Sequence, residues 1–201
     1  MKKIVSLILV CAVLALSVFG LASCKGEREI RDYYYAELTV KNFGTIIIKL
    51  DRTAAPITVD NFVKLSDEGF YDGLTFHRII SNFMIQGGDP EGTGSGGSKD
   101  TIKGEFDSNG HENPISHVRG TISMARANDP DSASSQFFIC NADSVYLDGK
   151  YAAFGSVVEG MDVVDAITEY GVQYAWGGVI YYKQYQPVIE SVVIHYEMPE
   201  K

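Results

Sequence analysis

Short apolar runs, each broken after a few residues by turn-forming residues, constrain the fold of this chain more than any other feature. The runs are rich in β-branched, aromatic and aliphatic residues, and glycine, asparagine, aspartate and proline separate them. They cover residues 35–41, 45–50, 75–80, 83–86, 120–124, 136–140, 152–158 and 188–196. Many short strands with turns between them are typical of an antiparallel sandwich or barrel, so we expect an all-β fold.

Two segments carry a helical pattern instead. Pro56 can open the first helix, and Gly69 can end it. Its inner face is expected to consist of the apolar residues Ile57, Val59, Phe62, Val63 and Leu65. The second helix is expected over residues 161–168, where apolar residues recur at helical spacing.

The N-terminus has the pattern of an export signal. Lys2 and Lys3 precede an apolar run over residues 4–21, and small residues follow it. Leu21-Ala22-Ser23-Cys24 matches the bacterial lipobox, in which the cysteine thiol is joined to a diacylglycerol. The apolar run is also long enough for an uncleaved membrane-spanning helix, which is the alternative. We expect a lipoprotein signal peptide over residues 1–23, a lipidated Cys24 with a polar tether over 24–33, and one domain over 34–201.

Charge restricts the partners of the exported chain. Removing residues 1–23 leaves 178 of 201 residues and takes away two lysines and no acid, so the formal net charge changes from −9 to −11. Nucleic acid and anionic lipid bind clusters of lysine and arginine, so an acidic surface disfavours both. Membrane attachment would then depend on acyl chains such as palmitate. We expect an extracytoplasmic lipoprotein of the cell envelope that is a monomer.

No motif indicates a cofactor, a metal or a nucleophile. Residues 92–97 satisfy the spacing of a dinucleotide-binding loop, but the sequence lacks the preceding strand and following helix that such a site needs. The four histidines show no zinc-ligand spacing. Cys140 follows Phe137-Phe138-Ile139, which favours a buried strand residue over a reactive thiol.

One dense block of motifs carries a family resemblance. Phe76-His77-Arg78-Ile79-Ile80 and residues 83–89 (Phe-Met-Ile-Gln-Gly-Gly-Asp) resemble the core signature of the cyclophilins. Residues 120–125, 135–139, 146–150 and 154–157 continue the match in the same order. The resemblance runs from about residue 35 to 168, and more loosely to 196. It implies a closed eight-stranded antiparallel barrel capped by two α-helices, with the substrate groove on an outer face.

The resemblance also implies peptidyl-prolyl cis/trans isomerase (rotamase) activity on X-Pro bonds of unfolded or extended exported polypeptides, which assists their folding. Rotation about a prolyl amide breaks no covalent bond, so the reaction needs no cofactor and no metal. Arg78 is expected to stabilise the twisted amide, and Gln86 to bind a substrate carbonyl. The expected substrate-binding residues are Phe83, Met84, Arg126, Gln136, Phe138, Tyr146 and Leu147. Residues 94–97 would line the pocket for the residue before proline, and His77 would face the core.

The sequence departs from the family pattern at several positions. Tyr146 stands where many cyclophilins have tryptophan, which implies weak cyclosporin binding, and Tyr151 stands where many have histidine. Arg126 replaces a common asparagine and could favour acidic peptide neighbours. Residues 170–185, with Trp176 and five tyrosines, align with no part of the family and would form a lid, a partner surface or a longer hairpin. Two other functions stay open: a proline-peptide-binding chaperone or scaffold without turnover, and a purely structural envelope lipoprotein.

Overall fold

The structure, a computed structural model, describes residues 30–200. The expected signal peptide, Cys24 and most of the tether therefore lie outside the described residues. No helix within residues 30–200 combines the length and apolar character that crossing a membrane requires.

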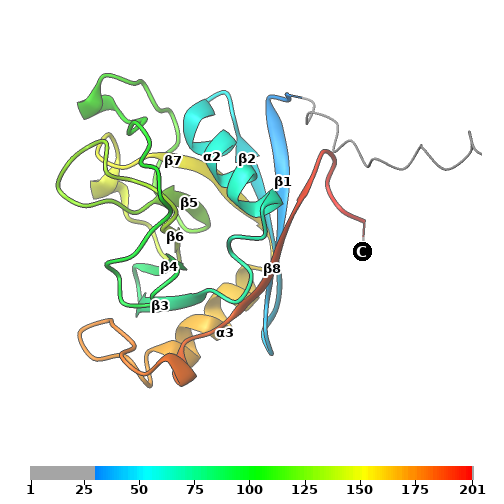
Figure 1. The fold of residues 1–201 in the computed structure, drawn as a ribbon, viewed down its shortest axis with the longest axis vertical. Helices are drawn as coiled ribbons and strands as arrows, with labels where there is room; N and C mark the ends of the chain where they lie inside the picture. The colour runs from blue at the N-terminus through cyan, green and yellow to red at the C-terminus, as the bar shows by residue number, and fades with distance from the viewer. Residues whose placement is uncertain (1–29, 201) are drawn as a thin grey trace, which may run out of the picture. The chain divides into compact units, whose positions relative to one another are not determined.

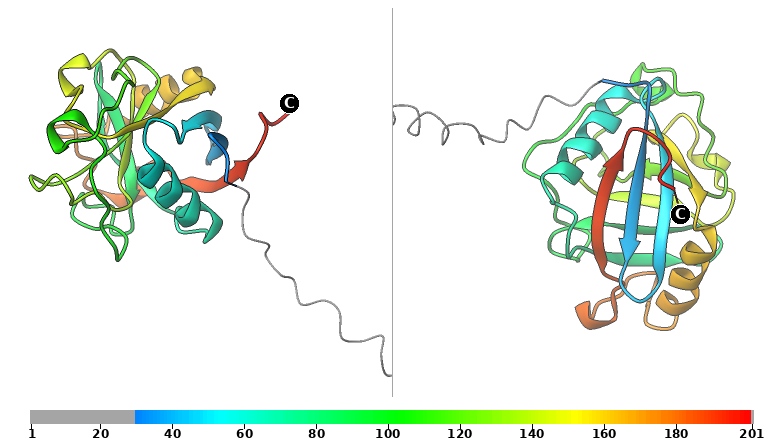
Figure 2. Two further views of the ribbon diagram at one scale, coloured as in Figure 1. Left: turned by 90° about the horizontal axis from the view of Figure 1, so that it is seen from above. Right: turned by 90° about the vertical axis from the view of Figure 1, so that its right-hand side faces the viewer.

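The strands of residues 30–200 form one curled antiparallel sheet in the order β3-β4-β6-β5-β7-β2-β1-β8 (Figure 1). Their bounds are β1 (Tyr33–Val40), β2 (Gly44–Asp51), β3 (Thr75–Ile80), β4 (Met84–Asp89), β5 (Thr121–Met124), β6 (Phe137–Cys140), β7 (Ala153–Glu159) and β8 (Ile189–His195). In Figure 2, β8, β1 and β2 lie side by side. Each expected strand is present, with ends displaced by at most three residues.

The expectation of a closed barrel is wrong, because the sheet stays open between β8 and β3. Thr75 of β3 forms one isolated bridge with Val188, the residue before β8, and no ladder joins the two end strands. Beyond that bridge, residues 178–180 occupy the free edge of β3, where Val179 pairs with Arg78. A strand edge can pair with one neighbour only. This segment therefore keeps β8 from extending the ladder, and the sheet is a half-barrel.

Two helices of the described chain lie at opposite ends of the half-barrel (Figure 2). Helix α2 (Pro56–Asp67) packs on β8 and β2, and α3 (Met161–Gly171) packs on β2, β3 and β4. The buried carboxylate of Glu105 accepts hydrogen bonds from the backbone N–H groups of Ile57 (3.0 Å) and Thr58 (2.8 Å), which satisfies free donors at the start of α2.

Ile57 does not belong to the inner face of α2, contrary to expectation. Its exposed fraction is 43%, whereas Thr58, Phe62 and Ser66 are buried. The buried stripe follows a spacing of four residues from Thr58, and Ile57 lies about 100° away from that stripe around the helix axis.

The interior of the half-barrel is filled by aromatic side chains. The ring of Phe62 lies 5.0 Å from Tyr71, 5.6 Å from Phe137 and 5.4 Å from Phe154, centroid to centroid. Successive residues of a strand face opposite sides of a sheet, so Phe138, next to Phe137, faces outward. Met84, Cys140 and Leu147 join Phe138 in a second apolar cluster, separate from the interior. A binding groove can therefore lie only on the outer face.

Candidate active site

Strand register brings three of the expected site residues into one row. Arg78 on β3 pairs with Gln86 on β4, and Gln86 pairs with Phe138 on β6. Residues directly opposite one another in antiparallel strands share a face of the sheet. A cation, an amide and an aromatic ring therefore lie next to one another on the outer face.

The guanidinium of Arg78 lies at the edge of the outer apolar cluster. Its Nη1 donates a hydrogen bond to Oε1 of Gln86 (3.2 Å) and lies 4.0 Å from the Sδ atom of Met84. Its Cζ lies 5.9 Å from the ring centroid of Phe83. The cation is thus held by one amide oxygen and faces apolar side chains.

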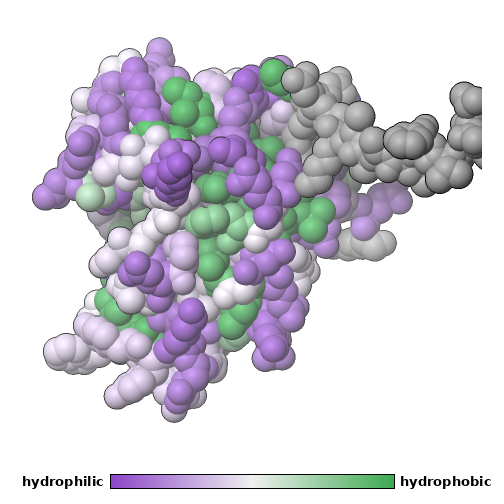
Figure 3. Space-filling view, in the orientation of Figure 1, coloured by the Kyte–Doolittle hydropathy of each residue, from purple (hydrophilic) through white to green (hydrophobic). Residues whose placement is uncertain are grey.

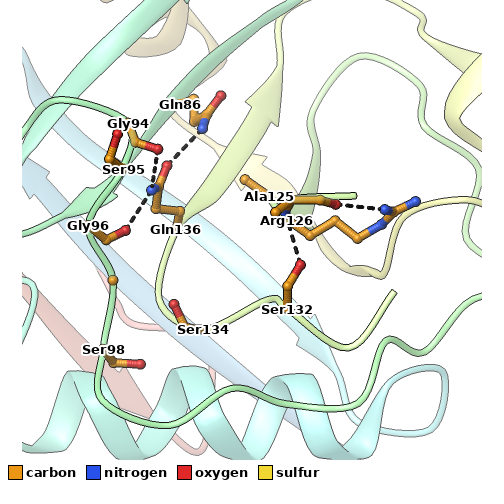
Figure 4. Close-up of a pocket in the computed structure, with 12 residues that line it drawn as sticks. Gln86, Gly94, Ser95, Gly96, Ser98, Ala125, Arg126, Ser132, Ser134 and Gln136 are labelled. Atoms are coloured by element: carbon orange, nitrogen blue, oxygen red, sulfur yellow. Dashed lines mark hydrogen bonds between the residues drawn. The ribbon is translucent and has the colours of Figure 1, made fainter. Parts of the chain in front are cut away.

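A chain of amide hydrogen bonds extends from Arg78 to a glycine-rich loop. Nε2 of Gln86 donates to Oε1 of Gln136 (2.9 Å). Nε2 of Gln136 then donates to the carbonyl oxygens of Gly94 (3.1 Å) and Gly96 (2.7 Å), as Figure 4 shows. The orientation of Arg78 is therefore coupled to the backbone of this loop.

A small cavity of about 140 Å³ opens beside Arg78. It is lined by Arg78, Phe83, Met84, Gln86, Ala125, Arg126, Phe138, Leu147 and Tyr151. His117 stacks on the Phe138 ring at 6.0 Å and 18°, and the edge of Tyr151 meets that ring at 6.0 Å and 83°. The aromatic floor is thereby fixed, and the volume suits one small apolar ring better than a drug-sized ligand of about 300–1,000 Å³.

A second, more polar cavity of about 340 Å³ adjoins the first (Figure 4). Its walls are Gln86, Gln136, Ser132, Ser134 and the two segments 94–98 and 125–127. Gln86, Ala125 and Arg126 line both cavities. An extended chain can therefore place neighbouring residues in the two cavities at once.

Asp89 organises the glycine-rich loop. Its carboxylate accepts hydrogen bonds from the backbone N–H groups of Glu91 (2.8 Å), Thr93 (3.0 Å) and Gly94 (2.6 Å). Burial alone would raise the pKa of Asp89, but these bonds and one from Gly96 outweigh burial and lower that pKa. The loop is thus wrapped around a carboxylate that is ionised at neutral pH.

Comparison with known proteins decides the family. Residues 35–194 match the family model described as "Cyclophilin type peptidyl-prolyl cis-trans isomerase/CLD". The chain belongs to the cyclophilin family. It is 45% identical over 145 residues to a peptidyl-prolyl cis-trans isomerase of Helicobacter pylori, covering 71% of this chain and 85% of the relative. It is 50% identical over 109 residues to isomerase B of Bacillus subtilis, covering 54% and 73%.

Solved cyclophilin structures share the fold. A cyclophilin-type isomerase of Cryptosporidium parvum superposes with a TM-score of 0.72 at 28% identity, covering 82% of this chain and 99% of that protein. The same protein has been solved in the presence of the dipeptide Ala-Pro. The expected family, its eight antiparallel strands and its peptidyl-prolyl isomerase activity are therefore confirmed for this chain.

Most of the expected site residues of this cyclophilin meet at the small cavity. It is lined by Arg78, Gln86, Phe83, Met84, Phe138, Leu147 and Arg126. Gln136 lines the polar cavity instead. Tyr146 lies at the rim, with an exposed fraction of 60% and its ring 5.9 Å from that of Phe83.

The charge of Arg126 is directed into the protein. Its Nη2 donates to the carbonyl oxygen of Lys150 (2.9 Å), and its Nη1 donates to that of Ala127 (2.8 Å). Its Cζ lies 4.7 Å from the ring centroid of Tyr151. The guanidinium therefore closes one wall of the site, and a preference for acidic peptides gains no support from this geometry.

Two cavity residues are absent from the sequence-based set, Ala125 and Tyr151. Ala125 lies in the matched segment 120–125, and Tyr151 was noticed only as a departure from the family pattern. Ala125 is adjacent to Arg126 in the sequence, and the ring centroid of Tyr151 lies 4.7 Å from Cζ of Arg126. The substitution of tyrosine for a common family histidine at position 151 is the one sequence signal that marks this position.

Two buried residues lie near the site without lining either cavity. His77 is 1% exposed, and burial lowers its pKa, so its ring is neutral at pH 7. Cys140 belongs to the outer apolar cluster, and burial raises its pKa to about 12, which leaves an unreactive thiol. Residues 30–200 contain no cluster of three or more His, Cys, Asp or Glu side chains that could hold a metal.

Proposed function

We propose that this cyclophilin is an envelope lipoprotein that isomerises X-Pro bonds of exported polypeptides through Arg78. The position of the Arg78 guanidinium at the edge of an apolar cavity carries the proposal, 4.0 Å from the Met84 sulfur and hydrogen-bonded to Gln86. The basic start, the apolar run and the lipobox at Cys24 support an exported, lipidated chain.

Arg78 would lower the rotational barrier by acting on the proline amide itself. Resonance holds the X-Pro amide planar with a barrier of about 18–20 kcal/mol, and twisting the bond returns the lone pair to the proline nitrogen. A guanidinium N–H can donate to that lone pair, which exists only near the transition state. A charged donor in a preorganised, partly dry site is worth more than the roughly 1.5–3 kcal/mol of an ordinary charged hydrogen bond.

The other site residues would hold the substrate while its amide turns. Phe83, Met84, Phe138 and Leu147 would enclose the proline ring, because they line the small cavity with apolar atoms. One N–H of Gln86 is bonded to Gln136, and its second N–H can bind a substrate carbonyl. The adjoining polar cavity would take the residue before proline. Positioning of this kind supplies the part of the rate enhancement that one hydrogen bond cannot.

Replacement of Arg78 by alanine tests the mechanism. We expect kcat/KM on a short Ala-Pro peptide to fall about 100-fold, the usual effect of losing one preorganised donor to a developing charge. NMR exchange measures the rate without a coupled protease. Arg119→Ala is the matched control, because Arg119 pairs with Asp165 on the surface (2.7 Å) and touches neither cavity. Equal activity of Arg78→Ala and Arg119→Ala would refute the role of Arg78.

Replacement of Cys24 by serine tests the anchor. The wild-type chain should incorporate labelled palmitate and sediment with membranes after export, whereas Cys24→Ser should do neither while keeping its activity on the short peptide. A single acyl chain binds membranes only weakly, so loss of the whole lipid group should release the protein. Unchanged palmitate labelling of Cys24→Ser would exclude the lipoprotein assignment and leave the role of Arg78 untouched.

A further inference from the structure

The segment over residues 170–188 extends the sheet face on which the site lies. Trp176 and Val179 form a bridge of their own, and Gly177 and Gly178 make the turn between them with positive φ angles of 60° and 87°. Positive φ at both central residues is the geometry of the tight turns that join antiparallel strands, and glycine adopts it without strain. A short hairpin therefore stands on the edge of β3.

This hairpin continues the row of site residues. Val179 pairs with Arg78, and Trp176 pairs with Val179. Paired residues share a face, so Trp176 projects from the same outer face as Arg78 and Phe138. Neighbouring strands lie about 4.8 Å apart, which places the Trp176 backbone about 10 Å from that of Arg78, or about three residues of an extended chain.

Aromatic side chains of the segment separate into those that build it and those left to solvent. Tyr174 and Tyr185 stack at 4.4 Å and 8°, and Tyr170 packs on Tyr174 at 4.9 Å, which fixes the base of the hairpin. Trp176 and Tyr181 form a separate pair at 6.3 Å, with exposed fractions of 79% and 65%. In Figure 3 the pale, uncharged side chains at the lower left belong to the region of the hairpin drawn there in Figure 1.

The surroundings favour an apolar ligand. Residues 170–189 contain no aspartate or glutamate in a chain whose net charge is −9. An apolar side chain can therefore settle on Trp176 without removing water from a carboxylate of this segment, which would be costly. A rigid aromatic platform also loses little conformational entropy when it binds.

We propose that Trp176 and Tyr181 form a subsite for an aromatic or large apolar side chain about three residues after the substrate proline. The inference rests on the proposed function, because it needs an extended chain with proline in the small cavity. The polar cavity takes the residue before proline, so the chain after proline leaves past Arg78 and reaches Val179 and Trp176. The hairpin thereby selects polypeptides whose proline is followed by apolar sequence.

Two peptides of equal length and composition test the subsite in the full-length protein. One carries phenylalanine three residues after proline, and the other carries it three residues before proline. We expect kcat/KM to be about 2- to 10-fold higher for the first, since an aromatic pair contributes about 0.5–1.5 kcal/mol. The gain should lie in KM, because the contact is distant from the twisting amide.

Variants separate the subsite from general effects of the segment. Trp176→Ala should bring the ratio between the two peptides to about 1, and Trp176→Phe should restore part of it. Tyr182→Ala is the matched control with a preserved ratio, because Tyr182 is equally exposed at 70% and its ring contacts Tyr185 rather than Trp176. A ratio that Trp176→Ala leaves unchanged would overturn the proposal.

Fluorescence gives a readout that does not depend on turnover. Trp176 is the only tryptophan of the chain, so its emission reports on this position alone. The peptide with phenylalanine after proline should shift the emission to shorter wavelength, and the other peptide should not. If the wild type isomerises neither peptide, the proposed function fails while the emission shift still decides the subsite. An equal shift with both peptides, or none with either, would overturn the subsite itself.

Discussion

Two buried histidines behind the site are expected to make the stability of the fold depend on pH. His77 is 1% exposed and His117 is fully buried. For each, burial lowers the pKa below the ordinary histidine value of about 6.5, and the bond of His117 to Asp148 (2.8 Å) opposes this lowering without reversing it. A histidine kept neutral by the fold binds a proton more readily once the chain is unfolded.

The free energy of unfolding should therefore fall as the pH drops below about 6.5. In that range the unfolded chain binds more protons than the folded chain, so stability rises with pH and is lost on acidification. Urea denaturation at pH 7.5 and pH 5.5, compared between wild type and His77→Leu, measures the contribution. His195→Gln is the control, since His195 is only half-buried beside Glu37 (2.9 Å). An equal pH dependence in wild type and His77→Leu would contradict the argument.

At the scale of single residues, the sequence predicted which residues belong to the site better than it predicted where their side chains point. The family resemblance located Arg78, Gln86 and Phe138, because their spacing in strands fixes which face they occupy. It gave no indication that Tyr146 would be 60% exposed at the rim beside Phe83, and it did not include Tyr151, which lines the cavity. Both stand in the loop that follows β6, where no strand periodicity dictates the direction of a side chain.

Among the structural elements, the glycine-rich loop and the hairpin segment are joined by one buried side chain. Gln186 is 4% exposed, and its Oε1 accepts a hydrogen bond from Oγ1 of Thr75 (2.6 Å). Its Nε2 donates to the carbonyl oxygens of Gly92 (2.8 Å) and Ile180 (2.7 Å). This one amide therefore ties the loop beside the polar cavity to the inner strand of the hairpin.

Gln186→Leu should loosen both elements together. The change keeps the size of the side chain but leaves two carbonyl groups and a hydroxyl without their partner, at a cost of about 1–3 kcal/mol for a buried polar group. Hydrogen exchange should become faster over residues 92–98 and 176–180, and KM for Ala-Pro peptides should rise. Gln173→Leu is the control, because Gln173, two residues past the end of α3, is exposed and its side chain bonds to the nearby carbonyl oxygen of Glu169 (2.9 Å). Faster exchange in one element alone would disprove the link.

The one architectural error, the closed barrel, also belongs to this scale. The pattern of apolar residues predicted every strand of the described chain, because alternation and turn residues are local signals. Closure of the barrel depends instead on which segment pairs with the free edge of β3. Residues 178–180 do so through the bridge between Arg78 and Val179, a pairing that no local pattern in the sequence indicates.

For the molecule as a whole, stability and activity rest on different apolar clusters: the interior cluster around Phe62 holds the fold, and the outer cluster around Phe138 forms the site. Phe62 contacts three other rings in the interior and is fully buried, so Phe62→Ala should lower the free energy of unfolding by about 3–5 kcal/mol. Val158→Ala is the control: Val158 is 43% exposed on β7, and its loss should cost no more than about 0.5 kcal/mol. Urea denaturation measures both. A loss below about 1 kcal/mol for Phe62→Ala would show that the interior repacks around the gap.

The reactivity of Cys140 reports how often the catalytic face opens. Among residues 30–200 it is the only thiol, it is fully buried directly beneath the groove, and its pKa of about 12 keeps it protonated. An alkylating reagent attacks thiolate and must reach the sulfur, so Cys140 reacts only while a local opening exposes it. The alkylation rate of Cys140 therefore measures the frequency of these openings. A ligand bound above Phe138 should lower that rate.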